Sequence, residues 1–206
     1  MNKTTDDYFI VLIPTRDGKA FIDMVDLLEK VGYALGRETL IVNCDGTTYW
    51  DARNNCIEKL RKALRIYGIS TVKGTAKILW CDSDLLIDEP LDKLVGYFMD
   101  SDKTGIPFAA NYKTTFPGGV VNTVMLPTGD GNYKTLTDSE LDVLKYGVNR
   151  TGMVAGLGFY YGFVPLDYQY HVYPPYKTED ICFYIDNKVE FRLVPIKLLH
   201  NKNVMI

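Results

Sequence analysis

Two aspartates that directly follow an apolar run are the residues of this sequence best suited to chemistry. Asp82 and Asp84 come after residues 78–81, Ile-Leu-Trp-Cys, which has the composition of a buried strand. Side chains two residues apart on an extended chain point to the same side, so both carboxylates can face one site. Neighbouring carboxylates repel each other, and a divalent cation, Mg²⁺ or Mn²⁺, relieves that repulsion. The pair predicts a cation site, whereas an isolated Asp-x-Asp triplet is also typical of a solvated turn.

Three further residues have side chains that could take part in chemistry. Thr178 is a candidate helix N-cap, which would put Glu179 and Asp180 in the first turn, where the helix dipole favours ionised carboxylates. Acidic residues are common at helix starts, so this placement alone does not indicate catalysis. His200 lies near the end of the chain, where a surface histidine is also ordinary.

The elements that must position these side chains alternate through the first half of the chain. Apolar runs predict buried strands at 8–13, 39–44 and 77–81, and helical spacing of apolar residues predicts helices within 21–35, 57–67 and 91–98. This βαβαβα order predicts an α/β fold with a mostly parallel, twisted sheet and helices on both faces. Ligands bind beyond the carboxyl ends of such strands, where Pro14, Thr15, Arg16, Asp45 and Asp82 fall.

The second half of the chain has a different character and predicts a smaller antiparallel part. We expect a short strand at 106–110, hairpin arms at 120–126 and 133–136, and a final strand at 190–194. A capping box at 137–140 opens a helix to about Tyr146, and Thr178 opens another through Lys188. Residues 152–162 are rich in glycine and aromatics. With no repeat or linker, residues 1–206 are expected to form one domain.

Composition excludes several classes of protein. A net charge of −3 provides no basic field for nucleic acid, and Lys59, Arg61, Lys62 and Arg65 are interpreted as a solvated helix face. The four cysteines form no close pair and favour a reducing, cytoplasmic setting. We expect no signal peptide and no transmembrane segment.

Five pieces of the sequence, in this order, resemble the GT-A glycosyltransferases of the family-2-like, inverting kind. They are Pro14-Thr15-Arg16 after the first strand, Ala52-Arg53-Asn54, the Asp-x-Asp motif Asp82-Ser83-Asp84, Gly156-Leu157-Gly158-Phe159, and Glu179-Asp180 followed by His200. The resemblance covers most of the chain and implies a Rossmann-like GT-A fold, with a nucleotide-binding half (1–100) and an acceptor-side half (101–206). In its short length the chain resembles a compact viral or prokaryotic member of the family. Such a member would act in the cytoplasm, or in the cytoplasm of the host if it is viral.

The resemblance also implies a role for each matching residue. Asp84 and His200 would ligate the cation, Asp82 would contact the metal's waters or the donor ribose, and Asp180 would be the catalytic base. The donor would be a UDP- or GDP-linked sugar, and the sequence does not define the acceptor. The residues implied to bind the nucleotide sugar are Pro14, Thr15, Arg16, Asp45, Arg53, Asp82, Ser83, Gly156, Gly158 and Glu179.

Two other functions fit parts of the pattern. A nucleotidyltransferase also uses paired carboxylates and a nucleotide, but it usually has a glycine-rich, basic loop after the first strand, and residues 14–19 contain one glycine. A nucleotide-sugar-binding module without catalysis needs no base. The presence of Asp84, Asp180 and His200 argues against this second alternative.

Overall fold

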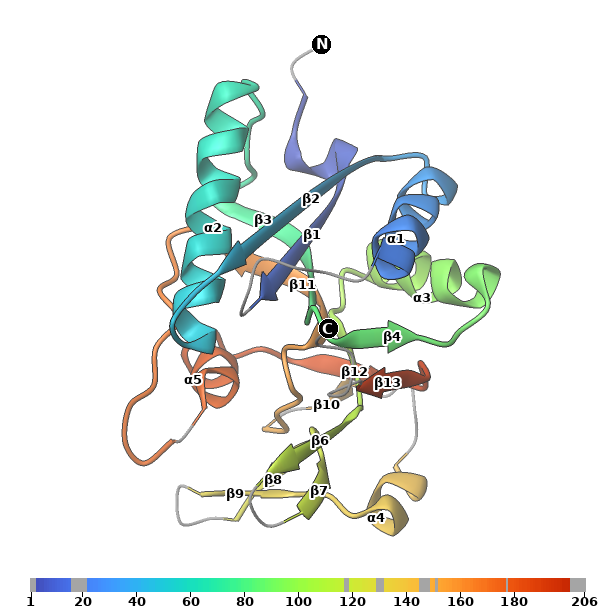
Figure 1. Ribbon diagram of the computed structural model, residues 1–206, viewed down its shortest axis with the longest axis vertical. Coiled ribbons are helices and arrows are strands. Elements are labelled where there is room, and N and C mark those ends of the chain that lie inside the picture. Colours follow the sequence, from blue (N-terminus) through green and yellow to red (C-terminus); the bar gives the residue numbers. More distant parts are fainter. Residues whose placement is uncertain are drawn as a thin grey trace.

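One mixed β-sheet organises the part of the chain that the computed structural model describes, which is residues 3–15, 22–116, 119–128, 132–144, 149–150, 152–176 and 178–200. Its seven strands have the order β10-β12-β5-β11-β3-β1-β2 (Figure 1). Five strands run in one direction, whereas β11 and β10 are antiparallel to their neighbours. The strands are β1 (Tyr8–Thr15), β2 (Glu38–Asp45), β3 (Thr75–Cys81), β5 (Phe108–Ala110), β10 (Asn149–Arg150), β11 (Phe159–Pro165) and β12 (Phe191–Val194).

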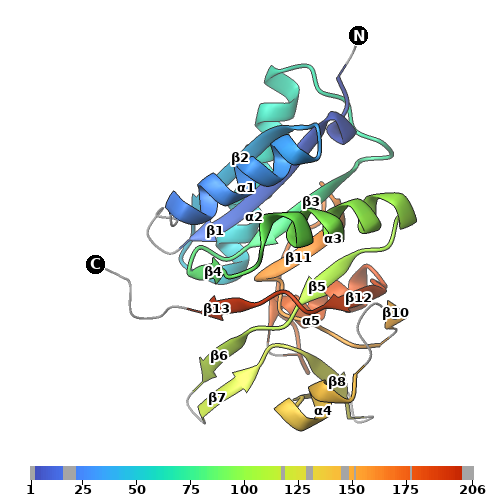
Figure 2. The ribbon, with the colours of Figure 1, turned by 90° about the vertical axis from the view of Figure 1, so that its right-hand side faces the viewer.

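Helices cover both faces of this sheet (Figures 1 and 2). Side chains alternate along β1: Phe9, Val11 and Ile13 pack against α1 (Ile22–Ala34) and α3 (Leu91–Thr104). The intervening Ile10 and Leu12 belong to the core that includes α2 (Tyr49–Ile66) and α5 (Glu179–Asp186). The continuous apolar sequence of β1 follows from this burial on both faces.

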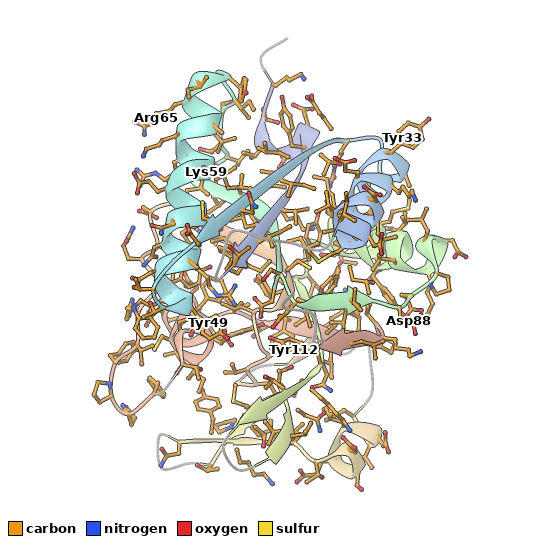
Figure 3. The ribbon with its side chains drawn as sticks, in the orientation of Figure 1. Tyr33, Tyr49, Lys59, Arg65, Asp88 and Tyr112 are labelled. Carbon is orange, nitrogen blue, oxygen red and sulfur yellow. The ribbon has the colours of Figure 1, made fainter. Side chains whose placement is uncertain are left out.

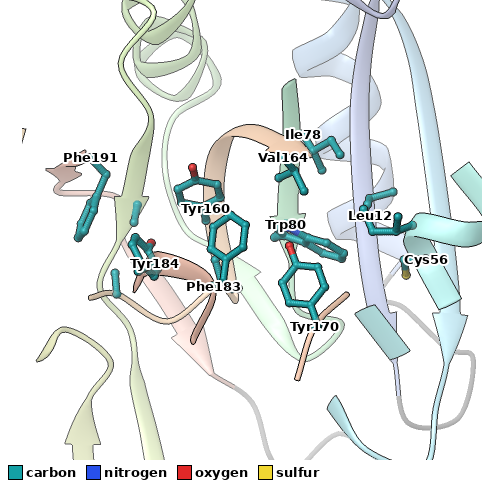
Figure 4. Close-up of a cluster of buried hydrophobic side chains, with 14 of the residues drawn as sticks. Leu12, Cys56, Ile78, Trp80, Tyr160, Val164, Tyr170, Phe183, Tyr184 and Phe191 are labelled. Atoms are coloured by element: carbon teal, nitrogen blue, oxygen red, sulfur yellow. The ribbon is translucent and has the colours of Figure 1, made fainter. Parts of the chain in front are cut away.

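Aromatic side chains fill the core between the sheet and α5 (Figure 4). The Trp80 ring meets the edge of Tyr170 at 5.4 Å between centroids, and Tyr170 stacks on Phe183 at 5.6 Å. Tyr160 on β11 contacts Phe183 at 5.7 Å and Tyr184 at 5.8 Å. Such pairs each contribute about 0.5–1.5 kcal/mol beyond the area that they bury. The packing therefore holds α5 against the strands that precede the candidate site.

Short elements lie outside the seven-stranded sheet, with η1 before the start of β1 and the others in the second half of the chain or directly after β3. They are η1 (Thr5–Asp7), β4 (Leu85–Ile87), β6 (Lys113–Phe116), β7 (Gly119–Asn122), β8 (Met125–Pro127), β9 (Tyr133–Thr135), α4 (Asp138–Asp142) and β13 (Leu198–His200). The pairs β4–β13, β6–β7 and β8–β9 are antiparallel. In the first pair His200 lies opposite Leu85, so the backbone of His200 is beside the residue that follows Asp84.

The strands and helices predicted for the first half of the chain are confirmed, including the three parallel strands β1, β2 and β3. The mostly parallel sheet is corrected to a mixed one, because β11 lies antiparallel between β3 and β5. No strand was expected there, since Gly162 interrupts the apolar run and Pro165 ends it.

Other elements of the second half also differ from expectation. The arm expected at 120–126 is two strands, because Thr123 bonds to the Tyr112 carbonyl and Met125 to Val154. The helix expected to reach about Tyr146 ends at Asp142, and Tyr146 lies outside the described residues. The strand at 191–194 is not the last, since β13 follows it.

Strands from both halves of the chain share the same sheet. None of the helices in the described ranges has the length and apolar character needed to cross a membrane.

Candidate active site

The candidate site lies where β1, β2 and β3 end. Thr15 and Asp45 are paired at the last register position of β1 and β2, and Asp82 follows the last residue of β3. The Asp82 amide donates a hydrogen bond of 2.8 Å to the carbonyl of Gly158, which leads into β11. Polar side chains from separate segments therefore meet at the edge of the sheet where α/β proteins bind ligands.

Strand alternation decides which way Asp82 faces. Ile78 and Trp80 on β3 pack in the core on the α2 and α5 side, whereas Leu79 and Cys81 pack on the other side. Asp82 has the same parity as Trp80, and its carboxylate contacts Arg53 of α2. The expected direction is thus observed for Asp82. Ser83 and Asp84 lie in a turn, in which the Leu85 amide donates to the Asp82 carbonyl at 3.2 Å, so the extended geometry assumed for the pair does not continue to Asp84.

Arg53 joins three carboxylates that are far apart in the sequence. Its Nη2 lies 3.3 Å from Asp82 Oδ1 and 3.7 Å from Asp180 Oδ1, and its Nε lies 3.4 Å from Glu179 Oε1. The guanidinium also lies over the Trp80 ring, 5.1 Å from the centroid. With only 2% of the side chain exposed, Arg53 acts as a fixed, buried cation that holds the end of β3 to the start of α5.

Local sequence explains why these side chains converge. The Thr48 hydroxyl accepts a hydrogen bond from the Asp51 amide and starts α2, so that Arg53 falls in the first turns of that helix. The Thr178 hydroxyl accepts one from the Ile181 amide, which confirms the predicted N-cap of α5 and puts both acidic residues in its first turn. Two capped helix starts therefore face each other across the end of β3.

The neighbouring Asn54 fixes a second segment. Its Nδ2 donates to the Tyr170 carbonyl at 2.9 Å, and its Oδ1 accepts from the Tyr170 amide at 2.7 Å. The amide side chain thus pairs with the backbone as an adjacent strand would, and it holds the loop before α5. Arg53 thus contacts the carboxylates, and the adjacent Asn54 holds Tyr170, which packs in the aromatic core.

The site has an excess of negative charge. Asp82, Glu179 and Asp180 share the one guanidinium, and the charge of Asp84 also acts on Asp82. Burial is the main cause that raises the pKa of Asp82 above its ordinary value, and the Arg53 charge acts in the opposite direction. Burial, and then Glu179, raise the pKa of Asp180 well above its ordinary value. Because of these three carboxylates, the pKa of Arg53 is raised although burial opposes its charge.

Tyr112 completes the surroundings of Asp82 and was not identified from sequence. Its hydroxyl donates to Asp82 Oδ2 at 3.3 Å, on the opposite carboxylate oxygen from Arg53 (Figure 3 labels Tyr112). The side chain is 7% exposed, and burial, with the charges of Asp82 and Asp180, raises its pKa well above the ordinary value. Tyr112 is one of 15 tyrosines, and no local pattern distinguishes it.

The two glycines of the Gly-x-Gly segment make room for this tyrosine. A Cβ on Gly158 would lie 2.1 Å from Tyr112 Oη and 2.5 Å from Asp82 Oδ2. A Cβ on Gly156 would lie 2.8 Å from the same hydroxyl and 3.0 Å from Thr123 Cβ. The absence of side chains at 156 and 158 therefore has a packing cause within the protein itself.

The remaining predicted residues are placed as follows. Pro14 and Thr15 are buried at the end of β1, and Ser83 and Asp84 are half-buried beside Asp82. Asp45 is exposed at the end of β2, where its carbonyl accepts from Asn55 Nδ2 at 2.8 Å. Arg16 and the side chain of His200 lie outside the described residues.

The donor chemistry fits a hard cation, but the described side chains do not form a complete set of ligands. Within the described ranges, no three histidine, cysteine, aspartate or glutamate side chains are grouped so that they could hold a metal ion. Mg²⁺ and Mn²⁺ sites often use one or two carboxylates and take the remaining ligands from substrate phosphates and water. Asp84 and Asp82 can serve in that way, since each ionised carboxylate has about four acceptor positions.

Comparisons with known proteins add no family assignment. Neither a protein-family model nor a curated protein sequence matches the chain.

A shallow hollow lies on α1 and the start of α3, on the other side of the sheet from Arg53. It is lined by Asp26, Glu29, Lys30, Tyr33, Ala34 and Leu91. The carboxylates around Arg53 lie apart from this hollow, at the carboxyl edge of the sheet.

Proposed function

We propose that the chain is a metal-dependent glycosyltransferase that moves a sugar from a nucleoside-diphosphate sugar to an acceptor hydroxyl with inversion. The observation that carries this proposal is the convergence of Asp82, Glu179 and Asp180 on the buried Arg53 at the carboxyl edge of the sheet. The same convergence joins the Asp-x-Asp and Glu-Asp pieces, which resemble motifs of the GT-A family. The mixed α/β sheet is compatible with a Rossmann-like GT-A fold, which we include in the proposal.

In the proposed reaction, the acceptor oxygen attacks the anomeric carbon as the bond from that carbon to the donor phosphate oxygen breaks. The bonding pair leaves on the diphosphate, and the acceptor proton passes to the Asp180 carboxylate. Burial raises the pKa of Asp180, which makes its ionised form a better proton acceptor than an exposed aspartate. Arg53, which contacts both Asp180 and Asp82, would keep the base at a fixed distance from the donor end of the site.

Asp84 and Asp82, with His200 as the resemblance implies, would hold a divalent cation. When bound, Mg²⁺ or Mn²⁺ would neutralise the charge that develops on the leaving diphosphate. The excess of carboxylates over Arg53 supports this part of the proposal, since a cation offsets the repulsion among them. Tyr49 and Trp50, 48% and 37% exposed at the start of α2, are further candidates to contact the nucleotide (Figure 3 labels Tyr49).

Nucleotide binding is the first test. We expect UDP or GDP to raise the melting temperature only in the presence of Mn²⁺ or Mg²⁺, by mass action on the folded state. Asp84→Ala should abolish this cation-dependent shift, and the matched variant Asp26→Ala, which changes an exposed residue on α1, should retain it. Undiminished manganese-linked binding by Asp84→Ala would refute the metal assignment.

Turnover is the second test, and it separates the enzyme from its alternatives. Incubation with nucleotide sugars and Mn²⁺ should slowly release free sugar, and Asp180→Asn should bind the nucleotide but release none. Binding without release by the natural chain would indicate a binding module. Formation of pyrophosphate from a nucleoside triphosphate and a sugar phosphate would indicate a nucleotidyltransferase.

A further inference from the structure

The end of α2 and the loop that follows it carry an unusual combination of exposed charge and exposed apolar surface. Residues 58–73 contain five basic side chains and one acidic one, a net charge of +4 in a chain whose net charge is −3. Lys59, Arg61, Lys62 and Arg65 are all exposed along α2, and Figure 3 shows Arg65 near the end of this helix. Lys59 Nζ donates to the Asn43 carbonyl of β2 at 3.1 Å, and Lys62 pairs with Glu58 at 2.7 Å. Basic charge is therefore concentrated on one part of an acidic protein.

Apolar side chains are exposed at the tip of this basic helix. Ile66 and Tyr67 are 78% and 71% exposed, and Val72 in the following loop is 49% exposed. All three lie within seven residues of the chain, next to Arg65 and Lys73. We call residues 61–73 the basic tip. An exposed apolar group beside basic side chains is typical of segments that enter the interface of a bilayer.

Backbone geometry makes the basic tip a fixed shape. The Gly68 and Ile69 amides bond back to Arg65 and Leu64 and close the end of α2, and Gly68 has a φ of 64°. Val72 to Thr75 form a second tight turn, with a bond of 3.0 Å from the Thr75 amide to the Val72 carbonyl. Ile69, 8% exposed, anchors the loop between these turns in the core. Little ordering is therefore needed when the tip binds a surface.

We infer that the basic tip docks on an anionic lipid bilayer, with Ile66, Tyr67 and Val72 entering the headgroup region. Arg61, Arg65 and Lys73 would attract the acidic headgroups, each contributing a factor of about five to the partition coefficient. Ile66 and Val72 are aliphatic and offer neither stacking nor hydrogen bonds to nucleic acid, so the apolar component favours lipid over a polyanion.

This surface is distinct from the candidate active site. Ile66 at the end of α2 lies 13 residues after Arg53, which is about 20 Å along the helix from the residue that binds the carboxylates. Figure 1 shows the beginning of α2 near α5 and its end at the opposite extremity. Docking of the tip would leave the carboxyl edge of the sheet accessible. The inference does not depend on the proposed glycosyl transfer.

Vesicle sedimentation of the full chain tests the inference. We expect binding to phosphatidylcholine vesicles that contain phosphatidylserine, weak binding to phosphatidylcholine alone, and loss of binding as salt is raised. The double change Arg61→Gln and Arg65→Gln should weaken binding about 25-fold, at about fivefold for each charge. Lys30→Gln with Lys103→Gln removes the same charge from exposed positions on α1 and α3 and should leave binding unchanged.

The apolar contribution has its own measurement. Ile66→Ser with Tyr67→Ser should weaken vesicle binding at least about tenfold, whereas Tyr33→Ser, at a residue 88% exposed on α1, should not. Brominated lipids should quench Tyr67→Trp fluorescence and not that of Tyr33→Trp. Equal binding to neutral vesicles would overturn the inference. So would equal effects of the tip and control variants, or binding to RNA or DNA that is insensitive to Ile66 and Tyr67.

Discussion

The hydroxyl of Tyr112 occupies the space in which a side chain at Gly158 would begin. A Cβ at position 158 would lie 2.1 Å from Tyr112 Oη, closer than any stable contact, and 2.5 Å from Asp82 Oδ2. The Gly158 carbonyl also accepts the Asp82 amide at 2.8 Å. The glycine therefore allows the end of β3, the start of β11 and the hydroxyl that serves Asp82 to meet at one point.

Gly158→Ala should separate Tyr112 from Asp82 and lower the free energy of unfolding by about 1–3 kcal/mol, the usual cost of overpacking. Urea unfolding measures the change. The control is Gly96→Ala in α3, where an added Cβ meets no atom within 4 Å and should stabilise the helix by up to about 1 kcal/mol. A Gly158→Ala variant as stable as the natural chain would contradict this packing.

Tyr112→Phe should raise the pKa of Asp82 further. The hydroxyl donates to an oxygen of the ionised Asp82 carboxylate and so lowers its pKa. Without that hydrogen bond, the effect of burial, which raises the pKa of Asp82, is opposed less strongly. Carboxyl-carbon NMR across a pH titration would follow the change, with Asp82→Asn to assign the resonance. If Asp82 holds the proposed cation, manganese-linked nucleotide binding should also move to higher pH. Tyr176→Phe is the control, and an unmoved Asp82 titration would remove Tyr112 from this role.

Local signals were enough to predict the first half of the fold. The apolar run at 8–13 and the helical spacing of apolar residues at 57–67 each reflect which side chains of that one element are buried. Such a pattern can be recognised within a short stretch of sequence. β11 could not be predicted in that way. Unlike the continuous apolar run of β1, its sequence is interrupted by Gly162. A Cβ at that position would lie 2.7 Å from Pro107 Cβ, a contact made across strands that no local pattern records.

The acidic residues of the candidate site could be predicted from the sequence, but the residues that contact and position them could not. Asp82 and Asp180 are of the residue types that such chemistry needs, and each follows a recognisable strand end or helix cap. The contact of Tyr112 with Asp82 depends instead on β11 lying between β3 and β5, which brings the end of β5 near Asp82. Asn54 belongs to the Ala52-Arg53-Asn54 piece, but its bonds to the Tyr170 backbone depend on a loop whose path no local pattern specifies.

Arg53→Met should be strongly destabilising at neutral pH. The change keeps the volume of the side chain but leaves Asp82, Glu179 and Asp180 without their cation, and uncompensated buried charge costs about 3–5 kcal/mol. The loss should shrink in acid, because Asp82 and Asp180 have raised pKa values and accept protons readily. Urea unfolding at several pH values measures both effects. Arg61→Met, at an exposed position of the same helix, should change stability by less than about 0.5 kcal/mol.

Asp180→Asn should stabilise the protein at neutral pH when no divalent cation is present. The pKa of Asp180 is raised in the folded state from its ordinary 3.8, so the folded protein holds this proton more tightly than the unfolded chain does. The contribution of Asp180 to the free energy of unfolding is fully present below its ordinary pKa of 3.8 and is lost as pH rises through its raised pKa in the folded state. Between these two pKa values, the loss is about 1.4 kcal/mol for each pH unit. Asparagine cannot ionise and avoids that loss.

The unfolding free energies of Asp180→Asn and the natural chain should therefore converge in acid and diverge towards neutrality, measured in EDTA to remove cations. Asp167→Asn, at an exposed position, should run parallel to the natural chain throughout. If Asp180→Asn were instead less stable at neutral pH, the Arg53–Asp180 contact at 3.7 Å would outweigh the cost of burial. Asp180 would then be a structural ion-pair partner rather than the poised base that the proposed reaction requires.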